Sequence, residues 1–183
     1  MNFINNILVS YFENLRNTSP TSVVQINEIF HDIKQGRWER EILACRQNLE
    51  LKKELPSFTP TGIYSTRNTK GLLHYTKVIC LDIDHVDDVL KLKEKCKAIP
   101  WVWASFVTPS GKGLKVFVLT DSDEESFKIY DAEIAVAFYD ETGYIRDERC
   151  KDISRLQFIS FDPELYLNEN PTQFKLKGAT ERC

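Results

Sequence analysis

Long apolar runs and paired cysteines are what this chain of 183 residues lacks. No apolar stretch approaches the ~20 residues that a membrane-spanning helix needs. The N-terminus also lacks the basic region followed by a long apolar segment that marks a secretory signal. We therefore expect a cytoplasmic protein with no membrane partner.

Cysteine and histidine are too scattered to suggest a disulfide framework or a structural zinc site. The five cysteines include no Cys-x-x-Cys pair, and their number is odd. Cys80 lies inside an apolar segment, where a small core side chain is expected. The three histidines are far apart in the sequence. Any metal site would therefore depend mainly on carboxylates.

Charge is unevenly distributed, although the net charge of −3 does not by itself indicate a nucleic-acid-binding protein. Residues 121–141 are strongly acidic, and we expect them to face solvent away from any phosphate ligand. Basic residues gather at 37–53 and again at 146–155. Such runs usually form solvated faces, so they only modestly favour an anionic partner.

The order of expected elements in the second half predicts an α+β fold. Helical periodicity and β-branched runs give strand, helix, strand, strand, helix and strand, which is the ferredoxin-like (RRM-like) arrangement of a four-stranded sheet backed by two helices. The expected ranges are 78–85, 86–98, 101–107, 114–119, 123–139 and 153–160.

The first half is expected to form an αβ appendage that closes over this sheet. The pattern predicts a strand over 3–12, a helix over 23–34 that Gly36 ends, a helix over 38–53 and a short strand over 62–65. We expect a single domain over residues 1–167, with lobes 1–76 and 77–167, followed by a tail or linker over 168–183.

Two aspartates follow each other at alternate positions near the end of the apolar strand 78–85. Side chains alternate along a strand, so Asp82 and Asp84 share a face. Paired carboxylates repel one another, and a hard cation such as Mg²⁺ or Mn²⁺ removes that repulsion. In the alternative interpretation, one aspartate begins a turn and the other caps a helix from Val86. His85 could lie near the metal or simply cap the strand end.

A glycine-rich hairpin between the next two strands suits a phosphate group. Glycines let backbone N–H groups approach an anion, and Lys112 and Lys115 add positive charge. The loop is not a Walker loop, because no helix-opening Gly-Lys-Ser/Thr follows. The candidate phosphate-binding residues of this hairpin are Ser110, Gly111, Lys112, Gly113 and Lys115.

A metal site for phosphoryl transfer would also need a third carboxylate. Asp147 and Asp152 are the candidates, since both lie just before the last apolar strand. The alternative is a solvated loop with weak local ion pairs.

These segments resemble the three-motif pattern of the archaeo-eukaryotic primase superfamily, and most closely its VirE N-terminal-type, primase-polymerase-like domain. The resembling segments are Asp82-Ile83-Asp84, the hairpin from Thr108 to Lys115, and the stretch from Asp147 through Asp152 to Pro163. The region of Leu55 to Arg67 also resembles the segment before the first motif. Active members generally carry histidine where this chain has Lys115.

The resemblance implies a role for each candidate residue. Asp82, Asp84 and Asp147 would be catalytic and bind Mg²⁺ or Mn²⁺, with Asp147 favoured over Asp152 because of its distance from Arg155. The hairpin and Arg155 would hold the triphosphate. Asp152 could instead orient Arg155. Arg67 and His85 are weaker candidates.

The resemblance therefore predicts a DNA primase or primase-polymerase module of a phage or mobile element. Its partners would be nucleoside triphosphates and single-stranded DNA, with a helicase domain or protein as a further candidate. Two alternatives remain open. The chain could be a non-catalytic nucleotide- or nucleic-acid-binding module, or a protein of a mobile element that acts on its host by protein contact alone.

Overall fold

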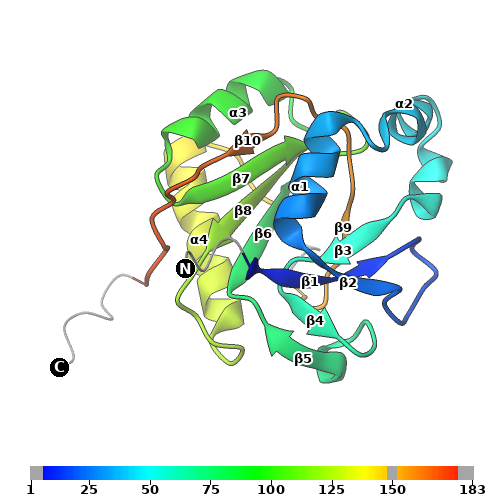
Figure 1. The fold of residues 1–183 in the computed structure, drawn as a ribbon. Coiled ribbons are helices and arrows are strands. Elements are labelled where there is room, and N and C mark those ends of the chain that lie inside the picture. The colour runs from blue at the N-terminus through cyan, green and yellow to red at the C-terminus, as the bar shows by residue number, and fades with distance from the viewer. Residues whose placement is uncertain (1–5, 148–151, 177–183) are drawn as a thin grey trace.

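The computed structural model describes residues 6–147 and 152–176, and these form a mixed α+β structure (Figure 1). In the N-terminal lobe, an antiparallel sheet of order β2-β1-β3-β9 stands beside the small sheet β4-β5, and its strand β9 (Gln157–Phe158) comes from the second half of the chain. The elements of the first half of the chain are β1 (Leu8–Phe12), β2 (Ser22–Gln25), α1 (Ile26–Gln35), α2 (Glu39–Gln47), the 3₁₀ helix Leu49–Glu54, β3 (Ser57–Thr59), β4 (Gly62–Tyr64) and β5 (Leu72–Tyr75).

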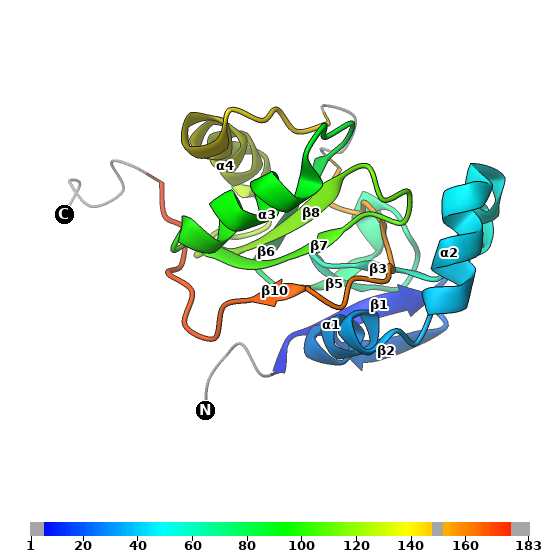
Figure 2. The same cartoon turned by 90° about the horizontal axis from the view of Figure 1, so that it is seen from above.

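The second half is built on a sheet of order β10-β7-β8-β6. Helices α3 and α4 cover one face of it, and the N-terminal lobe covers the other (Figure 2). The elements of the second half of the chain are β6 (Val78–Ile83), α3 (Val89–Ala98), β7 (Val102–Val107), β8 (Leu114–Leu119), α4 (Phe127–Thr142), β9 (Gln157–Phe158) and β10 (Tyr166–Leu167).

Alternation along β8 explains how one sheet serves two cores. Val116 and Val118 point to the helices, whereas Phe117 points to the N-terminal lobe. There Phe117 stacks on Phe106 and meets the edge of Phe30 from α1, with ring centroids 5.4 and 5.0 Å apart. This aromatic cluster joins the two lobes. Lys115, two residues before Phe117, therefore also faces the N-terminal lobe.

The α+β class is confirmed, but the last expected strand is wrong. Only Gln157–Phe158 of residues 153–160 is a strand, and it pairs with β3 of the N-terminal lobe. The fourth strand of the main sheet is β10, which lies beside β7 rather than β6. The reason is that Thr61 and Tyr64 both donate hydrogen bonds to the carbonyl of Ile153 and hold the segment on the N-terminal lobe.

Several element boundaries also differ from the sequence prediction. Residues 22–25 form β2 rather than the start of a helix, because their backbone pairs with β1. The expected helix over 38–53 is divided into α2 and a 3₁₀ helix. The short strands β3 and β5 were not predicted. By contrast, Gly36 ends α1 in the left-handed conformation with φ of 80°.

Residues 168–176, the described part of the expected tail, lie against the main sheet. The amide of Asn168 donates to the carbonyl of Trp103 at 2.7 Å, and that of Phe174 donates to Leu119 at 2.8 Å. The Phe174 ring also meets Trp101 edge-on, with centroids 5.4 Å apart. Among the described residues, no helix is long and apolar enough to cross a membrane.

Candidate phosphate-binding site

A pocket of about 410 Å³ brings together residues that are far apart in the sequence. Five of the predicted site residues line it, namely Arg67, Asp82, Lys115, Asp152 and Arg155. Lys52 also lines the pocket, so four cationic side chains face two carboxylates. We call this the cationic pocket. Its charge balance favours an anionic ligand.

At the base of the cationic pocket, Asp82 and Lys115 form an ion pair with Oδ2 and Nζ 2.7 Å apart. The two residues are direct partners in the β6–β8 register, so the pair spans neighbouring strands. Only 4% of the Lys115 side chain is exposed, and 15% of that of Asp82. A buried ammonium group requires such a partner. Lys115 therefore already supplies a positive charge at the carboxylate predicted to bind metal.

The other predicted metal ligands lie near Asp82 without completing a metal centre. The amide of Asp147 donates to the carbonyl of Asp82 at 2.8 Å, which places its backbone at the edge of β6. Asp84 is half-buried and does not line the cationic pocket. Within residues 6–147 and 152–176, no group of three or more His, Cys, Asp or Glu side chains is arranged to hold a metal ion. The Mg²⁺ or Mn²⁺ site stays a prediction.

The alternative in which an aspartate caps a helix starting at Val86 is wrong in its details. Helix α3 begins at Val89, and its cap is Asp88, whose carboxylate accepts from the Lys91 amide at 2.9 Å. His85 is exposed and has a positive φ of 55°, so it turns the chain away from β6. Asp84 therefore does not cap α3.

The predicted phosphate-binding hairpin is divided between two places. Lys115 lies in the cationic pocket, but Ser110, Gly111 and Lys112 are at the tip and do not line it. At the tip, the Ser110 hydroxyl accepts from the Lys112 amide at 3.3 Å. Gly111 adopts a φ of 75° beside the Arg46 side chain of α2. The tip is therefore a second cationic region rather than a wall of the pocket.

Gly113 is required where β8 begins, because a Cβ there would lie 2.5 Å from the carbonyl oxygen of Ile83. We expect Gly113→Ala to push β8 away from β6 and to disturb the Asp82–Lys115 pair. The expected loss of unfolding free energy is about 1–3 kcal/mol, as for overpacking in a core. Denaturant unfolding would measure it. The exposed Gly143 is unsuitable as a control although its Cβ would meet nothing within 4 Å, because its φ is positive at 76°. The exposed substitution Ala132→Ser provides the reference instead.

The turn over residues 152–155 presents Arg155 to the cationic pocket. The Asp152 carboxylate accepts from both the amide and the hydroxyl of Ser154 at 2.8 Å. The Asp152 carbonyl accepts from the Arg155 amide at 2.9 Å. Burial raises the pKa of the Tyr64 hydroxyl far above its ordinary value, so this group remains a donor to Ile153. Asp152 therefore orients Arg155 through the backbone of the turn.

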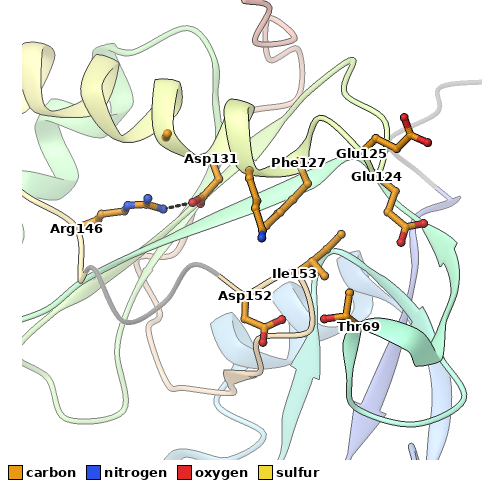
Figure 3. Close-up of a pocket in the computed structure, with 10 residues that line it drawn as sticks. Thr69, Glu124, Glu125, Phe127, Asp131, Arg146, Asp152 and Ile153 are labelled. Atoms are coloured by element: carbon orange, nitrogen blue, oxygen red, sulfur yellow. Dashed lines mark hydrogen bonds and ion pairs between the residues drawn. The ribbon is translucent and has the colours of Figure 1, made fainter.

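A larger cavity of about 780 Å³ adjoins the cationic pocket and shares Asp152 with it. Glu124 and Glu125, near the start of α4, line this cavity together with Asp152 and Ile153 (Figure 3). The expectation that residues 121–141 face solvent is wrong for Asp131 on this wall. Its carboxylate is buried against the Arg146 guanidinium.

Sequence reasoning missed residues that line the cationic pocket or stabilise the fold elsewhere, because tertiary contacts bring them into place. Leu15 and Phe158 line the pocket, and the Lys52 ammonium lies 5.2 Å from the Phe158 ring centroid. Asp162 forms a buried ion pair with Lys93 of α3 at 2.8 Å. The only available signals were the basic run over 37–53 and the Asp-Pro at the end of the third resembling segment.

Comparison of the chain with known protein families gives one result. Residues 50–167 match the family described as BT4734-like, N-terminal domain. The match covers more than half of the chain, which belongs to this family. Its range contains every residue of the cationic pocket except Leu15. No curated protein and no solved structure gives a significant match.

Proposed function

We propose that this chain is a primase-polymerase-like nucleotidyltransferase module with an RRM-like catalytic sheet, derived from a phage or mobile element. The observation that carries the proposal is the cationic pocket, where Asp82, Lys115 and Arg155 meet from three separate segments. A carboxylate at a strand end beside several phosphate-binding cations is the combination that nucleotidyl transfer needs.

In this proposal the cations of the pocket hold the triphosphate of an incoming nucleotide. Arg155 is exposed and offers a planar fork for bidentate contact with phosphate oxygens. Lys52 and Arg67 add charge from the N-terminal lobe. Lys115 contributes a compact point charge at the base. Together they neutralise charge that develops on the phosphates during transfer.

The carboxylates fit a divalent cation only if Lys115 yields its place beside Asp82. Asp82, Asp84 and Asp147 would hold Mg²⁺ or Mn²⁺, because Asp84 directly follows the end of β6, two residues after Asp82, and Asp147 is tied to Asp82 through its backbone. When bound, such an ion would lower the pKa of the attacking hydroxyl and neutralise the leaving pyrophosphate. Lys115 would then turn to the triphosphate.

The proposed nucleic-acid partner is single-stranded DNA, reaching the pocket past the hairpin tip. Arg46 lies beside Gly111 and donates to the Phe161 carbonyl at 3.0 Å, so it is held in place there. Lys112 is exposed at the same tip. Such a cationic strip suits a phosphate backbone. A helicase domain or protein is the further proposed partner.

The second candidate function is a non-catalytic nucleotide-binding module. The observation that favours it is the Asp82–Lys115 ion pair, which occupies the carboxylate on which catalysis would depend. In this case the pocket would bind a triphosphate through its cations, with no need for a metal.

Primer extension and de novo primer synthesis on single-stranded DNA, with Mg²⁺ or Mn²⁺, test the proposal directly. We expect a metal-dependent product from the wild-type protein and none from Asp82→Ala/Asp84→Ala. Asp87→Ala/Asp140→Ala, which alters two exposed carboxylates outside the pocket, is the matched control and should retain activity. Triphosphate binding by a folded wild type that makes no product would favour the binding module. A folded wild-type protein that neither binds a triphosphate nor makes product would contradict both functions.

A further inference from the structure

Helix α4 carries exposed apolar side chains on the surface that faces away from its own core. The inner face is buried through Tyr130, Ile134 and Phe138. On the outside, Ile129, Val136 and Tyr139 are 56%, 58% and 50% exposed. A helix that is apolar on both faces is usually covered on both. This outer face therefore differs from the polar face of an ordinary surface helix.

A groove of about 270 Å³ runs along this exposed side, between α4 and the C-terminal segment 172–176. Val136 and Ala137 contribute apolar surface from the helix, and Trp101 and Phe174 contribute it from the other side. We call this the α4 groove. Its volume is below the range typical of pockets for free small ligands. It suits one or two inserted side chains of a larger partner.

The helix side of the groove is acidic. Glu133, Asp140 and Glu141 line it together with the apolar residues, at spacings that place them on one helical face. Among the described residues, none of these three carboxylates takes part in an ion pair. Nucleic acid would be repelled by this rim, because the three carboxylates outnumber Lys175, which also lines the groove. A second copy of the chain would set like charges against each other.

We propose that the α4 groove binds a basic amphipathic helix of a partner protein. Apolar side chains of that helix insert over Val136 and Trp101, and its lysine or arginine side chains pair with Glu133, Asp140 and Glu141. This is the helix-in-groove mode of recognition, in which an apolar stripe gives affinity and flanking charges fix the register. The groove lies on the helix-covered side of the main sheet, so binding is independent of the cationic pocket.

A synthetic helical peptide of leucine and lysine with amphipathic spacing is the probe for this test, and its scrambled version is the peptide control. Binding is followed by tryptophan fluorescence, because Trp101 lines the groove whereas Trp38 and Trp103 are buried elsewhere. We expect the peptide to change the emission of the wild type, and Trp101→Phe to abolish that change. Fluorescence anisotropy of a labelled peptide then measures the affinity.

Two variants and a matched control localise the binding. Val136→Asp and Glu133→Lys/Asp140→Lys/Glu141→Lys should each weaken peptide binding by at least about tenfold. The control Glu13→Lys/Glu28→Lys/Glu41→Lys makes the same change in net charge at three exposed sites of the N-terminal lobe, and should weaken it much less. Circular dichroism verifies that each variant is folded.

Three results would overturn the proposal. The first is an absence of wild-type binding, and the second is an equal loss in both triple variants, which would indicate a net-charge effect alone. The third is a concentration-dependent dimer in sedimentation that Val136→Asp dissociates, since a second copy of the chain would then occupy the groove.

Discussion

Asp162→Ala is expected to lower the free energy of unfolding by about 3–5 kcal/mol, the cost of leaving one member of a buried ion pair without its partner. Lys93 and Asp162 are 4% and 5% exposed, and the carboxylate also accepts from the Val107 amide at 2.9 Å. Removing the carboxylate leaves the buried Lys93 ammonium group and the Val107 amide, at the end of β7, without this partner. Guanidinium unfolding, monitored by circular dichroism, measures the loss.

Two controls test whether the loss of unfolding free energy depends on the burial of the Lys93–Asp162 pair. Glu94→Ala removes the partner of Lys97 in an exposed pair on the same helix and should have no measurable effect. Lys93→Met/Asp162→Leu replaces both charges with apolar groups and should recover much of the loss. A loss below about 1 kcal/mol for Asp162→Ala, typical of exposed pairs, would show that solvent reaches the pair.

Asp82→Asn is expected to have opposite effects on triphosphate binding and on transfer. The substitution removes a negative charge from the cationic pocket and releases Lys115 from its ion pair. Binding of a nucleoside triphosphate in the presence of EDTA should therefore tighten by about tenfold, which corresponds to roughly 1.4 kcal/mol. Metal-dependent primer extension should fall by about 10²-fold or more. Isothermal titration calorimetry and extension assays measure the two effects.

Arg155→Ala is the matched comparison, because it removes a cation from the same pocket without touching the Asp82–Lys115 pair. It should weaken triphosphate binding with or without metal. If Asp82→Asn weakened binding in EDTA as Arg155→Ala does, the inference that Asp82 competes with phosphate for Lys115 would be wrong. Thermal unfolding of both variants shows whether the protein remains folded.

Local pattern predicted the part of the site that depends on neighbouring strands. Strand β8 begins and ends where the sequence indicated, and it lies beside β6 in one sheet, as expected. The structure adds that Lys115 lies directly opposite Asp82. Contacts distant in sequence were beyond such reasoning. Lys52 reaches the pocket from the 3₁₀ helix Leu49–Glu54, which is separated from β6 by three short strands. The local pattern of apolar and polar residues does not predict that Lys52 lies near Asp82 and Lys115.

The wrong prediction of a fourth sheet strand over residues 153–160 has the same cause, namely contacts that are distant in sequence. The apolar content of residues 153–160 is typical of a strand, but the partner of a strand depends on tertiary contacts. Here Thr61 and Tyr64 capture Ile153, and β3 pairs with Gln157 and Phe158. The sequence of the segment indicates that it is buried, but not which lobe it joins.

The Asp82–Lys115 pair also helps to determine the register in which β6 and β8 align. It is the only pairing of opposite charges in the described ladder between β6 and β8, which is otherwise mainly apolar. A shift of one residue would turn Lys115 toward the helices, and a shift of two in one direction would set it against Cys80 in the aromatic core. Either misalignment buries a charge without its partner. The residues proposed for chemistry thereby also penalise misfolded alignments, so selection for a unique structure alone would preserve them.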